Sequence, residues 1–202
     1  MNLRKKIEIS ICISVVISVI FSMMSFAKTS ERIRGEVLRL HVIANSDSDS
    51  DQNLKLKVRD AVLLAGSGVF DGSVDVKNAV EKITPEIPYL KAIAENVISE
   101  NGYDYDVEIT VSREYFPTRT YETVTLPAGR YLALRVIIGK GEGHNWWCVM
   151  FPAMCLPAAD KHKEADSVLD EEEIKLVEKN PRYEPRFRIV ELYEEFKNKI
   201  HC

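Results

Sequence analysis

Side chains that could perform acid–base or metal chemistry gather around an apolar, strand-like segment at residues 37–44. His41 lies inside this segment, and Asn45 and Asp47 follow it, just before a run of Ser and Asp. A His with an Asp can act as an acid–base or metal-binding pair, and a strand end beside a helix N-terminus is a usual place for a site. The alternative is a local network in which Asn45 and Asp47 satisfy amides of the turn.

Two adjacent tryptophans form the second group of interest. Trp146 and Trp147 follow a Gly-rich loop at residues 139–143 and the neighbouring His144. In an alternating strand one Trp faces the core and the other faces outward. An outward Trp beside a Gly-rich loop suits a partner contact, because Trp is enriched among residues that dominate interfaces. Packing under the last helix is the alternative. We treat His41, Asn45, Asp47, His144, Trp146 and Trp147 as candidate binding residues.

The cysteines allow several interpretations. Cys148 and Cys155 are a candidate disulfide if the chain is exported, because exported proteins meet an oxidising space. Buried free thiols are a second possibility. A zinc set with His144 and His162 is a third, although the paired C-x-x-C motif of many zinc sites is missing. We expect no metal and no cofactor.

Apolar periodicity predicts the elements that must position these residues. We expect strands at 37–44, 104–111, 119–125, 130–138 and 146–151, and helices at 51–65, 75–83, 86–100, 169–179 and 187–200. This order predicts an α+β fold in which helices pack on a mostly antiparallel sheet.

Three finer expectations concern which residues are buried. In the first strand, Arg39 and His41 should lie on the face opposite the apolar side chains, away from the core. The acidic stretch 160–173 should be a solvated insertion, and residues 28–35 a polar linker. The last helix should turn these side chains inward: Ile189, Leu192, Tyr193, Phe196 and Ile200.

The first residues have the pattern of an export segment. Three basic residues at positions 4–6 precede 18 residues without a charge, Ile9–Phe26. A helix of that length spans roughly 27 Å, enough for a signal peptide or an uncleaved anchor. Ser25-Phe26-Ala27 resembles a small-residue cleavage site and favours cleavage. We therefore divide the chain into residues 1–27, a signal peptide or anchor, and 28–202, one extracytoplasmic domain.

Composition excludes some functions. The 202 residues carry 27 Lys and Arg against 31 Asp and Glu, a formal net charge of −4. The low isoelectric point of about 5.7 does not favour a nucleic-acid-binding surface. The sequence also lacks G-x-S-x-G, H-E-x-x-H and P-loop motifs, so no standard catalytic signature is present.

Several stretches resemble the stage II sporulation protein R family of endospore-forming bacteria. They include Leu-His-Val-Ile-Ala-Asn-Ser-Asp at 40–47, Leu-Pro-Ala-Gly at 126–129 and Asn-Trp-Trp-Cys-Val at 145–149. The resemblance extends over most of 37–156 and weakens toward a short match at 187–191. Further matching positions are 51–62, 133–135, Gly139, Gly141, Pro152 and Cys155.

The resemblance implies a signalling role. Members of this family are made in the forespore and exported into the space between the two membranes. They trigger a membrane-bound aspartic protease of the mother cell, which cleaves the pro-form of sigma-E. The chain would then be a signal and not an enzyme, with that protease as its partner and the membrane touched only by its N-terminal segment. The family supplies no catalytic residues to carry over.

Two other functions remain open from the residues. The chain could be an envelope hydrolase that acts on the cell wall and enables signalling, with His41 and Asp47 as acid–base or metal groups. It could also be a wall-binding module in which Trp146 and Trp147 stack on sugars. This third reading is the weakest, because the sequence shows no tandem repeat.

Overall fold

The fold is built on a mixed four-stranded sheet. The computed structural model describes residues 3–121, 124–152, 172–174 and 184–200. The sheet has the order β2-β5-β1-β6, with β1 Leu38–Ile43, β2 Val107–Phe116, β5 Gly129–Ile138 and β6 Asn145–Phe151. β1 and β5 are parallel, while the β1–β6 and β2–β5 pairs are antiparallel. The predicted α+β class with a mostly antiparallel sheet is confirmed.

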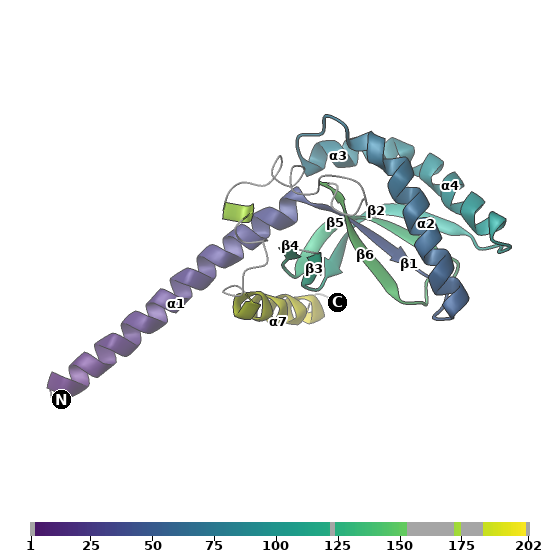
Figure 1. The fold of residues 1–202 in the computed structure, drawn as a ribbon. Helices are drawn as coiled ribbons and strands as arrows, with labels where there is room; N and C mark the ends of the chain where they lie inside the picture. The colour runs from purple at the N-terminus through teal and green to yellow at the C-terminus, as the bar shows by residue number, and fades with distance from the viewer. Residues whose placement is uncertain (1–2, 122–123, 153–171, 175–183, 201–202) are drawn as a thin grey trace.

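Three helices cover one face of this sheet (Figure 1). They are α2 Asp49–Ser67, α3 Val76–Ile83 and α4 Ile87–Glu100. The helices lie between β1 and β2 in the chain, and they supply the crossover that the parallel β1–β5 pair requires. Leu40 and Val42 of β1 pack in one apolar cluster with Val58 of α2 and Leu90 of α4.

The opposite face is covered by elements from both ends of the chain and by a short hairpin from its middle. They are the last turns of α1 (Leu3–Glu36), the short hairpin of β3 (Arg119–Tyr121) and β4 (Val124–Leu126), and α7 (Glu184–Ile200). Phe26 and Ile33 of α1 join Phe187 and Val190 of α7 in a second apolar cluster. The sheet is therefore buried on both faces, and all six residues of β1 are buried.

Arg39 corrects the expectation that the polar side chains of β1 point away from the core. Its side chain is fully buried, with the guanidinium carbon 4.0 Å from the ring centre of Phe116 and 4.9 Å from that of Tyr131. The guanidinium also donates to the Tyr121 hydroxyl. Burial lowers the pKa of Arg39. The aromatic faces compensate for part of the lost hydration, because their π electrons attract a cation.

The N-terminal segment is one helix that continues into the domain. Within the described residues, α1 is the helix long and apolar enough to cross a membrane, although a signal sequence meets the same criterion. The expectation of a polar linker at residues 28–35 is wrong, because this stretch forms the last turns of α1. Ser30, Ile33 and Arg34 are buried there, and Arg34 donates to the carbonyl oxygen of Ala128 at 2.8 Å.

The last helix faces the other way from the predicted orientation. Over residues 187–200, where the burial of its side chains is described, Phe187, Val190 and Glu194 are buried. The five apolar side chains expected to point inward are exposed instead: Ile189, Leu192, Tyr193, Phe196 and Ile200. The inward position goes to Glu194 because Arg34, which is itself buried, lies 3.5 Å from its carboxylate.

Only the end of the predicted acidic insertion 160–173 falls within the described residues. Glu173 is 1% exposed and accepts a hydrogen bond from Arg32 Nε at 3.0 Å, so this residue is not solvated as predicted. Of the helix predicted at 169–179, residues 172–174 are described and are helical. The remaining residues of both predictions lie outside the described ranges.

Candidate functional site

The first candidate residues lie where two loops meet at one end of the sheet. The chain leaves β1 after Ile43, and residues 139–144 of the Gly-rich loop run beside it before β6. Gly143 N–H donates to the Ala44 carbonyl at 2.9 Å, and Glu142 N–H donates to the Asn45 carbonyl at 3.2 Å. Lys140 N–H donates to Asn45 Oδ1 at 3.0 Å. These bonds hold the two loops together as one unit.

Glycine is required at two positions of this loop. Gly139 and Gly141 have φ angles of +56° and +64°, a region that side chains other than Gly adopt with difficulty. A Cβ atom at Gly139 would also collide with the side chain of Asn45, and one at Gly141 with Ile137. The backbone path of the loop therefore requires glycine at these two positions.

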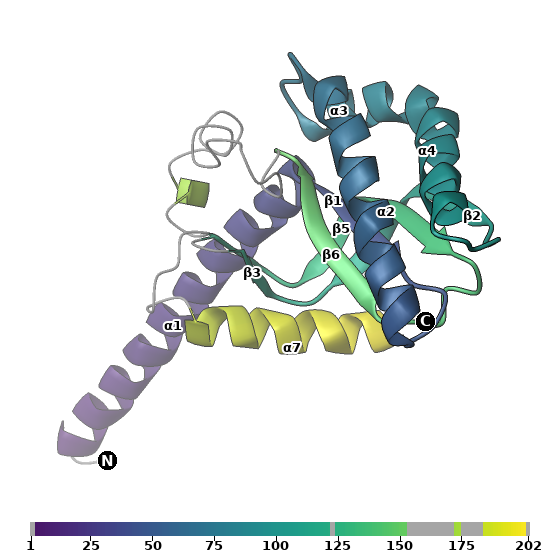
Figure 2. The same cartoon turned by 45° about the vertical axis from the view of Figure 1, so that its right-hand side comes forward.

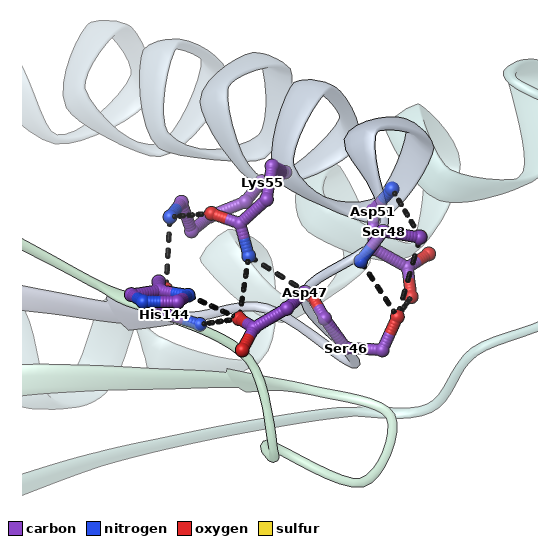
Figure 3. Close-up of polar contacts among 7 residues, drawn as sticks. Ser46, Asp47, Ser48, Asp51, Lys55 and His144 are labelled. Atoms are coloured by element: carbon purple, nitrogen blue, oxygen red, sulfur yellow. Dashed lines mark hydrogen bonds and ion pairs between the residues drawn. The ribbon is translucent and has the colours of Figure 1, made fainter.

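Asn45 belongs to a local network, as the alternative interpretation predicted. Its Nδ2 donates to Asp51 Oδ2 at 2.8 Å, and Ser46 Oγ donates to the same oxygen at 2.5 Å. Asp51 is buried at the start of α2, where Ser48 Oγ accepts from its backbone N–H at 3.2 Å (Figure 3). Burial alone would raise the pKa of Asp51, but the hydrogen bonds from Ser46 and Asn45 outweigh it and hold the pKa below its ordinary value.

Asp47 and His144 form an exposed pair beside this network (Figure 3). Asp47 Oδ1 accepts from the backbone N–H of His144 at 2.6 Å and also contacts His144 Nδ1. The side chains are 55% and 78% exposed. The hydrogen bond from His144 lowers the pKa of Asp47. Both chemical groups are thus held in place yet remain available to a partner.

A buried lysine, which no sequence pattern had indicated, completes this arrangement. Lys55 of α2 is 4% exposed, and its Nζ donates to the His144 carbonyl at 2.8 Å and to Gln52 Oε1 at 2.6 Å. Burial lowers the pKa of Lys55, while the nearby charge of Asp47 opposes that change. The only available indication was its position three residues after Gln52 on the helix.

Trp146 extends the same surface along α2. It is 37% exposed, and the guanidinium carbon of Arg59 lies 4.3 Å from its ring centre. Lys55 and Arg59 are one helical turn apart on α2, so they share a side of that helix. His144 lies in the loop directly before β6, two residues ahead of Trp146. We call the surface formed by Asp47, His144, Trp146 and the partly exposed Arg59, with Lys55 buried beneath it, the α2–β6 seam.

His41 and Trp147 lie in a different environment. His41 Nε2 is 2.8 Å from Asn145 Oδ1, and its ring contacts Phe116 and Trp147. Burial lowers the pKa of His41, which favours the neutral ring. Trp147 also stacks with Arg119, whose guanidinium carbon lies 4.3 Å from the ring centre. Both side chains lie on the face of the sheet that is covered by α1, the β3–β4 hairpin and α7.

The structure thus divides the six candidate residues into three groups. Asp47, His144 and Trp146 share the exposed seam, Asn45 supports the loops beneath it, and His41 packs with Trp147 on the other face. The acid–base pair of His41 with Asp47 is therefore not assembled, because each contacts different partners. The seam therefore presents a carboxylate, an imidazole and an indole to solvent from the hydrogen-bonded loops and β6.

The cysteine prediction is only partly within the described residues. Cys148 is buried on β6, whereas Cys155 and the potential zinc ligand His162 lie outside the described ranges. The bond between Cys148 and Cys155 stays a prediction. Among the described residues, no group of three or more His, Cys, Asp or Glu side chains could hold a metal ion.

A polar cavity of about 490 Å³ lies away from the seam, between α1, α7 and the sheet. Its cationic side chains come from α1, β2, β5 and α7: Arg34, Arg113, Arg130 and Lys197. Glu31 and Glu194 also line the cavity, and Arg34 forms salt bridges with both carboxylates. No sequence pattern indicated this cavity, since its residues are distant in the chain.

Comparisons with known proteins agree with the resemblance noted in the sequence. The family model described as stage II sporulation protein R matches residues 34–161, more than half of the chain. A protein of Bacillus subtilis (strain 168) named stage II sporulation protein R is 37% identical over 123 residues. The match covers 61% of this chain and 55% of that relative, so it spans about half of the relative's length. No solved structure matches.

Proposed function

Because the chain belongs to the stage II sporulation protein R family, we propose that it is an exported signal that activates a membrane-bound aspartic protease. The activated protease would cleave the pro-form of sigma-E in the mother cell. The chain would act in the space between the forespore and mother-cell membranes. The apolar helix α1 is compatible with export or anchoring and supports this location.

The observation that carries this proposal is the exposure of the α2–β6 seam. The imidazole of His144 and the carboxylate of Asp47 are held on hydrogen-bonded loops, the indole of Trp146 is held on β6, and all three are accessible to another protein. Trp, and charged groups on a preordered support, suit protein recognition because little entropy is lost on binding. The seam would contact the extracytoplasmic part of the protease.

Activation would work by shifting the protease between two states. A ligand shifts an equilibrium only through its different affinity for the two states. The seam must therefore bind the active protease more tightly than the inactive one. About 1.4 kcal/mol of difference is needed for each tenfold change in the population ratio.

The proposal can be tested in a non-sporulating bacterium. The full chain, the protease and the sigma-factor precursor are co-expressed, and precursor cleavage is followed on a blot. We expect cleavage only when the chain is exported. Absence of cleavage with all three proteins present and the chain exported would contradict a direct trigger.

Variants of the seam test the assigned surface. The double variant His144→Ala, Trp146→Ala should reduce cleavage by at least about tenfold, as expected when a dominant interface residue is lost. Tyr89→Ala is a matched control, because Tyr89 is an exposed aromatic residue on α4. Equal cleavage by the folded double variant and the control would remove the seam as the contact surface.

The envelope hydrolase is less well supported by the geometry. That function requires His41 and Asp47 to act together. His41 lies on β1 and contacts Asn145, Phe116 and Trp147, whereas Asp47 lies in the loop after β1 and contacts His144. Release of soluble fragments from purified cell wall by the wild-type chain, lost in His41→Ala, would reverse this preference.

A further inference from the structure

The outward face of α7 is an apolar stripe with no covering element among the described residues. Its five side chains are between 51% and 64% exposed: Ile189, Leu192, Tyr193, Phe196 and Ile200. These residues follow the i, i+3, i+4, i+7 pattern, with Leu192 and Tyr193 adjacent, and this pattern places them on one side of the helix. A soluble helix normally turns such a stripe toward its own core, but here Phe187 and Val190 already fill the inward side. The stripe therefore needs another explanation.

The charges around the stripe favour an anionic surface. Lys197 and Lys199 are exposed in the last turns of α7. Two acids of the helix are turned away from solvent, since the side chains of Glu191 and Glu194 are 15% and 10% exposed. The cavity beside α7 adds Arg113 and Arg130, so this side of an acidic chain is locally cationic.

The position of α7 relative to α1 indicates that this anionic surface is a lipid bilayer. The rings of Phe187 and Phe26 are in edge contact, with centres 5.2 Å apart. Phe26 is the last residue of the uncharged run Ile9–Phe26. A membrane crossed by this run would therefore end near the start of α7. In Figures 1 and 2, α7 lies on the side of the domain that faces the N-terminal half of α1.

We propose that α7 lies in the surface of the bilayer that α1 enters, with its apolar stripe against the lipid chains. Helices of this kind bury an apolar face at the boundary between headgroups and acyl chains and favour anionic lipids through flanking Lys and Arg. Tyr193 and Phe196 are aromatic residues of the kind enriched or tolerated at that depth. A second attachment beside α1 would hold the domain, and the α2–β6 seam with it, in one orientation on the membrane.

Tryptophan reporters in the full chain test this contact. Phe196→Trp and the control Leu64→Trp are each reconstituted in vesicles of phosphatidylcholine and phosphatidylglycerol, with and without brominated acyl chains. Leu64 is 74% exposed on α2, on the other side of the sheet. The natural Trp146 and Trp147 remain in both variants and give a common background. Because every variant keeps the whole of α1, differences between the variants report the position of the new ring.

Bromolipid should quench the added emission of Phe196→Trp by about twofold or more and leave that of Leu64→Trp unchanged, because quenching needs contact at acyl-chain depth. Tyr193→Trp, one turn away, should behave like Phe196→Trp. Equal quenching of Phe196→Trp and Leu64→Trp would overturn the proposal.

The same samples distinguish a second copy of the chain as the occupant. Shielding of Phe196→Trp from aqueous acrylamide that grows with the protein-to-lipid ratio, without bromolipid quenching, would mean that another chain covers the stripe and would overturn the proposal. Quenching that weakens when phosphatidylglycerol is left out would support the assigned role of the lysines.

Discussion

Individual side chains at the loop junction have separate tasks. Asn45 and Asp51 spend their hydrogen-bonding capacity inside the protein, whereas Asp47 and His144 remain exposed. A change at Asn45 would therefore disturb the support of the seam, and a change at His144 would alter the surface that a partner meets. Variants that test function should therefore change the exposed Asp47 or His144, and variants that test stability should change Asn45 or Asp51.

At Gly139, we predict that Gly139→Ala destabilises the fold by about 1–3 kcal/mol, because a side chain strains a positive φ and collides with Asn45. Thermal unfolding of the full chain in detergent, followed by near-ultraviolet circular dichroism, measures the loss. Gly68→Ala is the control, since Gly68 has a helical φ of −76° and open space around it. Equal unfolding temperatures for the two variants would contradict the strain.

At Asp51, stability should depend on pH below about 4. The pKa of Asp51 is lower in the folded protein than its ordinary value, so the unfolded chain binds the proton more readily. The stabilisation is present above the ordinary pKa and is lost as the pH falls through the folded pKa. Asp51→Asn should cost about 1–3 kcal/mol at neutral pH, and its deficit should shrink in acid.

Urea unfolding of the wild type and of Asp51→Asn, carried out at several values between about pH 2.5 and pH 7, would measure the stability deficit of the variant over the range in which Asp changes its charge. Asp49→Asn is the matched control, because Asp49 is exposed in the same first turn of α2. A deficit of Asp51→Asn that stays constant across the titration would rule out the ionised carboxylate as the cause.

On the scale of elements, α7 shows that an amphipathic pattern alone does not tell which face of a helix packs against the protein. Two apolar sets alternate around the helix, and the smaller set, Phe187 and Val190, meets the second cluster. Glu194 follows them inward because buried Arg34 offers it a partner. The larger set, from Ile189 to Ile200, is left on the surface.

The orientation of α7 predicts that replacing Phe187 by Ala destabilises the protein much more than replacing Phe196 by Ala. Phe187→Ala should reduce the free energy of unfolding by about 3 kcal/mol or more, since a buried ring and its contact with Phe26 are lost. Phe196→Ala should change it by less than about 0.5 kcal/mol, as surface substitutions do. Urea unfolding of both variants in detergent measures this, and a reversed order would mean that α7 packs by the originally expected face.

On the scale of the whole molecule, the N-terminal helix is part of the folded domain. Cleavage after Ala27, which the small-residue pattern favours, would remove Phe26 and leave the turns that hold Ile33 and Arg34. A cut at that position would therefore take a buried ring out of the folded domain. The second apolar cluster is complete only while Phe26 is present.

A pair of truncated chains tests this coupling. Residues 28–202 should unfold at lower urea concentration than residues 22–202, by about 3 kcal/mol in free energy, because the buried ring of Phe26 is missing. Phe26→Ala in the longer chain should reproduce most of the loss. Identical stability of the two chains would show that the domain does not depend on Phe26.

Local patterns in the sequence were sufficient for the main elements and for the family. Period-two alternation located β5, and a continuous apolar run ending at Pro152 located β6. Asn101-Gly102 marked the end of α4, where Gly102 has a φ of +81°. These features depend on neighbours in the chain, so they can be recognised without the fold.

Long-range packing decided the rest. Arg39 is buried because α1 and α7 cover a second face of the sheet, which the alternation of β1 could not indicate. Lys55 and His144 are 89 residues apart and meet only because α2 lies beside β6. A sequence shows which face of an element is apolar, but the free energy of burying that face depends on which other surfaces are available to cover it.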